Sequence, residues 1–95
     1  MFFNQSDFGS RVRKCRKLAE ITQEELANRI GVDRNHVSRI ERGAKACSID
    51  LLVELSAALH VSTDYLLTGQ SIDREAIRTQ VLSVISLLSR IAQNL

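Results

Sequence analysis

The first forty residues repeat apolar positions at helical spacing. The earliest set is Phe8, Val12, Cys15 and Ala19. Intervals of four, three and four residues place these side chains on one face of a helix of about twelve residues. Leu26, Ala27 and Ile30 repeat the pattern in a second segment, and Val37 and Ile40 repeat it in a third. The spacing therefore predicts three consecutive helices, each with a buried face.

Capping residues mark the ends of the second and third segments. Thr22, followed three residues later by Glu25, is a capping box, in which each side chain binds a backbone N–H that the helix leaves free. Gly31 ends this helix, since a left-handed conformation is least costly for glycine. Asp33 caps the third helix, which ends at Gly43. Two short helices joined by a turn with a glycine are typical of a helix-turn-helix.

Two further helices are predicted before residue 70. Ser48 caps a helix from Ile49 to about Leu59, and a short helix over Thr63–Leu67 ends at Gly69. The residues expected to face the core are Ile49, Leu52, Leu55 and Leu59 in the first helix, and Leu66 and Leu67 in the second.

The last segment, residues 73–95, differs in character. Its apolar residues recur at alternating intervals of four and three: Ile77, Val81, Val84, Leu88, Ile91 and Leu95. This heptad pattern is typical of helices that pair along an apolar seam. The seam is widened by Leu82, Ile85, Leu87 and Ala92. We expect this helix, about 33 Å long, to dimerise with its symmetry mate through Ile77, Val81, Val84, Leu88 and Ile91. The alternative is that it folds back on its own domain.

Composition supports an all-α fold. The chain has 95 residues, of which 44% are hydrophobic and only 4% aromatic, and it contains no proline. This is globular composition for one small domain, with few of the residues that strands and tight turns favour. We predict an N-terminal arm over residues 1–7, a five-helix domain over residues 8–69, and a C-terminal dimerisation helix over residues 73–95.

Charge is distributed unevenly along the chain. Residues 1–47 carry ten Lys and Arg and a net charge of +4, whereas residues 48–95 carry a net charge of −2. A basic front half indicates a polyanionic partner. A mixed solvated surface is an equally good explanation on charge alone.

The predicted helix-turn-helix has a family resemblance. Residues Thr22–Gly43 read TQEELANRIGVDRNHVSRIERG, preceded by RVRKCRK and followed by SIDLLVELSAALHVSTDYLLTG. Over Phe8–Gly69 the chain closely resembles the phage-repressor (Cro/CI, XRE-type) helix-turn-helix family of DNA-binding proteins. The resemblance implies a lambda-repressor-like fold and a third helix, residues 33–42, that lies in the major groove of double-stranded DNA.

The residues themselves support that implication. With Val37 and Ile40 facing inward, the outward face of the third helix is Arg34, Asn35, Ser38, Arg39 and Arg42. Arginine binds guanine and asparagine binds adenine through two hydrogen bonds each. The expected DNA-binding set is completed by Gln23, Asp33 and Lys45. By resemblance, Gln23 anchors a phosphate or braces residue 34, although a solvated glutamine is the simpler alternative.

Some other positions carry the residue types that are usual in the family, and some carry different ones. Arg16 and Glu41 resemble its internal ion pair between the first and third helices. Glu20 stands where a glycine is frequent, and His60 stands where glycine or asparagine ends the fourth helix. None of these positions is expected to contact DNA.

Several classes of function are not supported by the sequence. We see no nucleophile–base set or glycine-rich phosphate loop, so we predict no enzyme and no cofactor. His36, His60, Cys15 and Cys47 lack the spacing of zinc ligands, so no metal is expected. With no export signal, the two cysteines indicate reduced thiols in a cytoplasm. The final uncharged stretch is too short to cross a bilayer.

These observations predict a sequence-specific transcriptional regulator, a repressor that binds a palindromic operator as a homodimer. One alternative is a restriction–modification controller that both activates and represses. Another is an antitoxin or anti-regulator whose C-terminal helix binds a regulatory protein partner.

Overall fold

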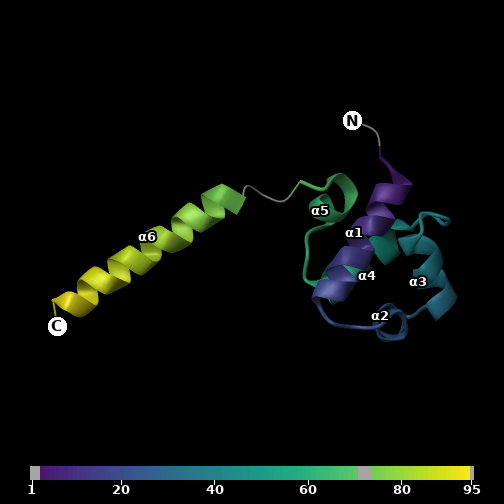
Figure 1. Cartoon of the computed structure of the whole chain (residues 1–95), viewed down its shortest axis with the longest axis horizontal. Coiled ribbons are helices and arrows are strands. Elements are labelled where there is room, and N and C mark those ends of the chain that lie inside the picture. The colour runs from purple at the N-terminus through teal and green to yellow at the C-terminus, as the bar shows by residue number, and fades with distance from the viewer. Residues whose placement is uncertain (1–2, 71–73, 95) are drawn as a thin grey trace.

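The computed structural model describes residues 3–70 and 74–94, together with the side chains of residues 3–70 and 78–94. This part of the chain is helical and contains no strand. The helices are α1 (Gln5–Leu18), α2 (Gln23–Ile30), α3 (Arg34–Glu41), α4 (Ile49–Leu59), α5 (Thr63–Thr68) and α6 (Arg74–Gln93). Helices α1–α5 pack together into a five-helix domain, whereas α6 stands apart from them (Figure 1). The predicted all-α class is confirmed.

Helix α1 begins three residues earlier than the apolar spacing predicted. The side chain of Asn4 caps it by accepting a 2.9 Å hydrogen bond from the backbone N–H of Asp7. In the first turn, the Gln5 amide donates to the carbonyl oxygen of Gly43 at 2.7 Å. Residues 5–7 are therefore part of the helix, and the expected arm over residues 1–7 is too long.

Helices α1 and α3 approach each other closely at Gly9. This glycine is buried, and a Cβ atom placed there would collide with the backbone carbonyl of Ile40 and lie 2.7 Å from that of Glu41. Only a residue without a side chain fits between the two helices at this point. Sequence periodicity gave no sign of this requirement.

The helix-turn-helix forms with the predicted caps. Thr22 Oγ1 accepts from the backbone N–H of Glu25 at 3.0 Å, and Glu25 Oε1 accepts from that of Thr22 at 3.3 Å. Gly31 is left-handed with a φ of 74°. Asp33 Oδ1 accepts from the backbone N–H of His36 at 2.8 Å. The capping pattern thus fixes both ends of α2 and the start of α3.

Every helix of the domain contributes to one core. Its largest fully buried side chains are Phe8, Leu26, Ile40, Leu55, Leu66, Val12 and Val37. Helices α2 and α3 pack on each other, α1 packs on α3, and α4 packs on α2. The core therefore holds α3 by one face and leaves its other face outside.

The predicted inner stripe of α4 is wrong at its first residue. Ile49 is 80% exposed, and Leu51 is buried with Leu55 and Leu59. The reason is geometric, because the side chains of Ile49 and Leu55 point about 120° apart around the helix, whereas those of Leu51 and Leu55 lie only about 40° apart. Leu52 is only half-buried. In α5, Leu66 is fully buried but Leu67 is half-buried, contrary to the expectation for both.

Two turns are left-handed at residues other than glycine. Glu20, between α1 and α2, has a φ of 59°, and His60, after α4, has a φ of 55°. These are the two positions at which the sequence departs from a family preference for glycine or asparagine. The backbone keeps the turn conformation although the side chain disfavours it.

Helix α6 exposes all of its described side chains. Its apolar members are Val81, Leu82, Val84, Ile85, Leu87, Leu88 and Ile91, each between 51% and 59% exposed. The side chain of Ile77 and residues 73 and 95 lie outside the described part. The prediction of a long C-terminal helix is confirmed for Arg74–Gln93, whereas the contact of α6 with a symmetry mate stays a prediction.

Candidate nucleic-acid interface

Helix α3 has two faces of opposite chemistry. Val37, Ile40 and Glu41 are buried. The outward side carries Arg34, Asn35, Arg39 and Arg42, all exposed, and Ser38, which is half-buried. The structure thus brings together on one surface the five residues that the sequence assigned to it.

The polar groups of this surface are largely unengaged. Within the described residues, Arg42 is the one member of the set whose side chain is hydrogen-bonded, with its Nε donating to the carbonyl oxygen of Ser38 at 3.3 Å. The guanidinium groups of Arg34 and Arg39 and the amide of Asn35 therefore keep their hydrogen-bonding capacity for a ligand.

Asp33 directly precedes α3, and Lys45 follows it in the segment before α4. The Asp33 carboxylate is occupied as the N-cap, which gives this residue a structural role whatever else it contacts. Lys45 is exposed in the segment between α3 and α4.

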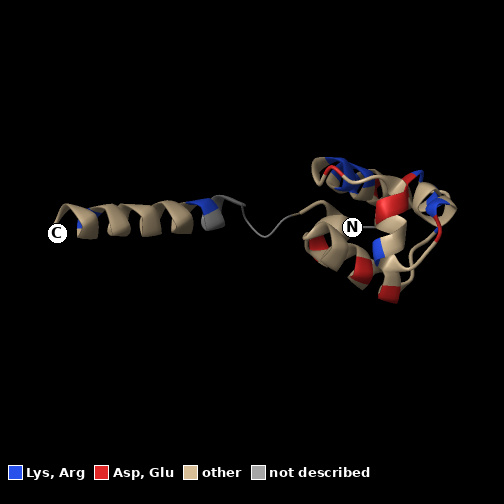
Figure 2. Cartoon of the chain, turned by 90° about the horizontal axis from the view of Figure 1, so that it is seen from below, with Lys and Arg blue, Asp and Glu red and all other residues tan. Residues whose placement is uncertain are grey.

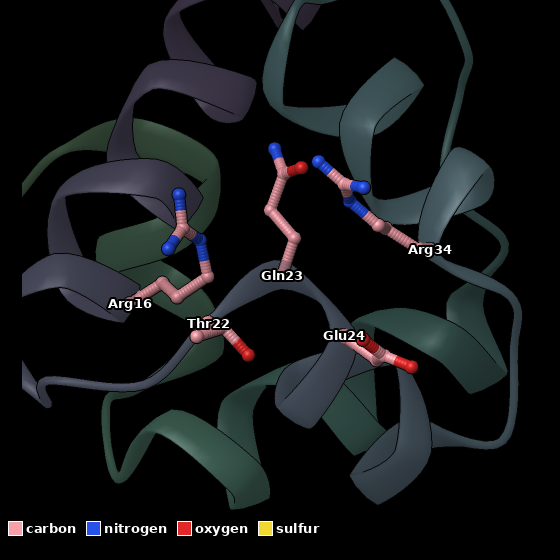
Figure 3. Close-up of a pocket in the computed structure, with 5 residues that line it drawn as sticks. All are labelled: Arg16, Thr22, Gln23, Glu24 and Arg34. Carbon is pink, nitrogen blue, oxygen red and sulfur yellow. The ribbon is translucent and has the colours of Figure 1, made fainter.

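Gln23 is positioned by an interaction that the sequence did not reveal. Its Nε2 donates to Oε1 of Glu41 at 3.2 Å. Figure 3 shows its side chain rising between Arg16 and Arg34, with the amide oxygen turned toward the Arg34 guanidinium. The hydrogen bond to Glu41 contradicts a freely solvated glutamine, whereas a contact of Gln23 with phosphate or with residue 34 stays a prediction.

The predicted ion pair between α1 and α3 is confirmed. Arg16 Nε lies 2.7 Å from Oε2 of Glu41, and the side chains are only 11% and 2% exposed. Arg16 also donates to Oε1 of Glu41 at 3.1 Å and to the carbonyl oxygen of Ile21 at 2.9 Å. The pair fixes the C-terminal end of α3 against α1, and through Gln23 it reaches the start of α2.

A shallow pocket of about 440 Å³ opens where these three helices meet. It is lined by Arg16, Thr22, Gln23, Glu24 and Arg34 (Figure 3). The pocket lies at the N-terminus of α2, whose free backbone N–H groups favour an anion. An anionic group at this place would be beside the Arg34 side of α3.

Charge is segregated on the domain. In Figure 2 most of the blue segments lie along the upper part of the five-helix domain, and the lower part carries mainly red. The exposed acids of α4 and α5 are Asp50, Glu54 and Asp64. The basic front half of the sequence therefore folds into a basic side of the domain.

The two cysteines are not activated. Burial raises the pKa of the Cys15 thiol, against a smaller opposing effect from Lys14. Burial also raises the pKa of Cys47, which is half-buried.

In residues 3–70 and 74–94 no group of three or more His, Cys, Asp or Glu is placed to hold a metal ion. None of the described helices is long and apolar enough to span a membrane.

Comparisons with known proteins agree with this geometry. A family model described as helix-turn-helix matches residues 12–66, more than half of the chain. The regulator YqaE of Bacillus subtilis is 36% identical over 64 residues, which are 67% of this chain and 55% of that relative. This chain spans about half the length of the first curated relatives that it matches.

Solved structures match the same region. The P22 c2 repressor, in complex with a synthetic operator, superposes with a TM-score of 0.65 and 38% identity, over 66% of this chain and 96% of that one. The restriction–modification controller C.AhdI from Aeromonas hydrophila gives 0.64 and 33%, over 67% and 93%. The matches confirm the five-helix repressor fold. YqaE, the P22 c2 repressor and C.AhdI are named as regulators, a repressor and a controller, and not as enzymes. The chain belongs to the helix-turn-helix family.

Proposed function

We propose that this protein is a sequence-specific DNA-binding regulator of transcription, a cytoplasmic repressor that binds an inverted-repeat operator as a homodimer. The observation that carries the proposal is the outward face of α3. Arg34, Asn35 and Arg39 are exposed there, and their polar groups are unengaged among the described residues. Because Val37 and Ile40 hold the opposite face in the core, the helix protrudes as a rigid element that fits a major groove.

The side chains on α3 suit base reading. Arginine pairs with guanine O6 and N7, and asparagine pairs with adenine N6 and N7, through two hydrogen bonds. The P22 c2 repressor, which shares this fold, was solved with an operator. We place Arg34, Asn35, Ser38 and Arg39 at base edges.

Phosphate contacts come from the rim of the same surface. Gln23 at the start of α2, Arg42 at the end of α3 and Lys45 beyond it are suitably placed. Such contacts release counterions, so the association constant falls steeply with salt concentration. Asp33 acts through its capping of α3, because a carboxylate is repelled by phosphate.

A homodimer matches the proposed operator. One helix-turn-helix covers one half-site, and two-fold dimers bind half-sites about 34 Å apart. The exposed apolar seam of α6 supplies a surface for pairing, because a large apolar patch on a soluble protein marks an interface. We propose Val81, Val84, Leu88 and Ile91, together with Ile77, as the dimer contact.

Arginine substitutions test the groove contact. Operator fragments are first selected from random duplex DNA with the full chain. R34A and R39A should each weaken binding by about 1–3 kcal/mol and relax preference at one base pair. R90A, on the polar side of α6, is the matched control and should bind as tightly as the wild type. If R34A and R39A bind the selected operator as tightly as R90A, α3 does not read the bases.

A restriction–modification controller is a second candidate function. The likeness to C.AhdI favours it. It would use the same DNA surface and add a contact with RNA polymerase. A reporter placed downstream of the selected operator separates the two, because a controller raises transcription in some operator positions and a simple repressor lowers it in all.

An antitoxin or anti-regulator is the remaining alternative. The exposure of α6 favours it, since that helix is free to receive another chain. In that case a different protein would co-purify with this chain at a fixed stoichiometry. A homodimer without such a protein, bound to DNA, supports the repressor.

A further inference from the structure

Among the large apolar side chains that the structure describes, the two most exposed lie on the five-helix domain. Leu18, at the end of α1, is 75% exposed, and Ile49, at the start of α4, is 80% exposed. Each stands beside charge of one sign, with Lys14 and Lys17 near Leu18 and Asp50 next to Ile49. A contact that covered both sites would remove two apolar side chains from water and bring opposite charges together.

The basic site is a groove along the outer side of α1. Side chains four residues apart form ridges on a helix. One ridge is Arg13 and Lys17, and the neighbouring ridge is Ser10, Lys14 and Leu18. A hollow of about 390 Å³ lies between the two ridges and is lined by these five residues. We call them the α1 groove.

The cations of the α1 groove have no acidic partner within the described part of the chain, where one ion pair is present, between Arg16 and Glu41. The groove is also turned from α3. Arg16 points toward α3, whereas Lys14 and Leu18, two positions from Arg16, point about 160° away around the helix. A duplex that lies against the outward face of α3 therefore leaves Lys14 and Leu18 uncovered.

The acidic site consists of two neighbouring ridges on α4. Asp50 and Glu54 form one, and Ile49 and Val53 form the other, all four exposed. Helices α4 and α5 contain no lysine or arginine, and in Figure 2 the acidic segments lie mainly on the lower part of the domain. We call these four residues the α4 ridges. They have no residue in common with the α1 groove.

We propose that the α1 groove of one copy of this chain binds the α4 ridges of another copy. Asp50 and Glu54 lie in the hollow between the two ridges of α1, and Ile49 and Val53 cover Leu18. Ridges of four-residue spacing on both helices interdigitate in the commonest class of helix packing. Three cations then face two carboxylates. A second copy is the favoured occupant because this chain supplies both the spacing and the opposite charge.

The contact links copies in succession, because each copy carries both surfaces on different helices. The inference rests on the proposed function, since it joins dimers bound at neighbouring operators and makes the second dimer bind more tightly than the first. Exposed charge pairs contribute little each. The contact therefore acts where DNA holds two dimers side by side and so raises their effective concentration.

Flanking DNA is the competing occupant of the α1 groove. Its phosphates would attract Lys14 and Lys17, as any polyanion does. They would gain nothing from Leu18, however, and would leave Ile49 in water. A second copy covers both apolar side chains at once.

Tandem operators test the contact. Selected operators are placed singly or in pairs, with the spacing varied by single base pairs over one helical turn, and the affinity of the full chain for the second site is divided by that for a single site. The wild type should reach a ratio of at least about five at the best spacing. K14E/K17E and D50K/E54K should each lower it to about one. R29E/R90E, the same charge change at exposed positions elsewhere, should keep the wild-type ratio.

A charge exchange makes the test specific. The variant K14E/K17E/D50K/E54K restores opposite charges with their signs reversed, so its ratio should return toward that of the wild type. L18D places a carboxylate against the acidic ridge at a position that is already exposed, and it should lose the ratio. Urea unfolding checks that each variant keeps the folded domain. Flanking DNA as the occupant would instead give single-site affinities that rise with flank length and fall in K14E/K17E, with a wild-type ratio of about one.

Cross-linking without DNA separates this inference from the proposed function. The variants L18C and I49C are mixed at high protein concentration and low ionic strength and treated with a short bismaleimide. The joined L18C and I49C peptides should be found by mass spectrometry. E24C, at an exposed position on α2, replaces L18C in the control and should give no joined peptide with I49C.

The outcomes separate the two proposals. A wild-type ratio of about one at every spacing overturns the joining of operator-bound dimers and leaves the proposed regulator standing. A ratio that persists in K14E/K17E and L18D, or that the exchanged variant does not restore, overturns the pairing of these two surfaces. A joined L18C–I49C pair in a protein with no preference for any duplex overturns the proposed DNA reading and supports the docking.

Discussion

The five-helix domain and α6 use the same apolar spacing with opposite results. In the domain, Val12, Leu26 and Leu66 are fully buried by neighbouring helices. In α6 each described large apolar side chain is more than half exposed. Helical periodicity identifies the apolar face of a segment in both cases, but it does not say what covers that face. The helices of the domain bury each other's apolar faces, and we infer that the apolar face of α6 is buried by another copy of the chain.

The contrast predicts that one substitution can lower the stability of the domain without changing association through α6, and that another can do the reverse. The domain depends on close contacts between α1 and α3, whereas association depends on the exposed face of α6. The substitutions below separate the two by measuring unfolding and molecular mass on the same variant.

The largest expected effect is that of G9A. Alanine at this position must push α1 away from the α3 backbone, which cannot yield as a side chain can. The cost should exceed the roughly 1–3 kcal/mol of an overpacked core. Urea unfolding of the domain should show a loss of about 4 kcal/mol or more, a large share of the stability of a small domain. Sedimentation should show unchanged association through α6.

S10A is the control for G9A. Ser10 is the next residue of α1 and is exposed, so alanine there should leave stability unchanged or slightly higher. A G9A protein that unfolds like S10A would show that α1 and α3 lie farther apart than described.

The next largest expected effect is the loss of folding stability in E41A. It leaves the Arg16 guanidinium, which is 11% exposed, without its carboxylate partner, and it removes the acceptor of Gln23. Breaking a buried pair in this way costs about 3–5 kcal/mol. Urea unfolding measures the loss, and E24A, at an exposed glutamate of α2, is the control. Equal midpoints for the two variants would contradict a buried ion pair.

A matched pair of leucines compares the two regions directly. Leu66 is fully buried in the domain, and Leu88 is 59% exposed on α6. L66A should lower the free energy of unfolding of the domain by about 2–5 kcal/mol and leave association unchanged. L88A should weaken association and leave the urea midpoint of the domain unchanged. If L88A also destabilised the domain, α6 would be packed on it.

Much of the domain could be predicted because its signals are local. The capping box at Thr22 and Glu25, the cap at Asp33 and the left-handed Gly31 each depend on residues within one turn of a helix. The outward face of α3 followed from two inward residues, Val37 and Ile40. These predictions need no knowledge of the rest of the fold.

The remaining features depend on distant contacts. The closeness of α1 and α3 at Gly9 and the hydrogen bond from Gln23 to Glu41 join segments that only the folded chain brings together. The error at Ile49 has a similar origin, because apolar residues occupy most of the first turn of α4 and only packing decides which of them is buried. For α6, the seam was visible in the sequence, but its partner lies outside the chain.

The smallest expected effect is a gain in stability from E20G. Glu20 has a φ of 59°, and a left-handed residue with a side chain costs about 1–2 kcal/mol. Glycine removes this cost but loses about 0.5–1 kcal/mol to the greater freedom of the unfolded chain. Urea unfolding should therefore show a net gain of about 0.5–1 kcal/mol, with association through α6 unchanged. K14G, at an exposed right-handed position in α1, has no strain to relieve and should instead lose about 1 kcal/mol. Opposite signs for these two glycines would locate the strain in the turn before α2, and a loss in both would show that Glu20 is not strained.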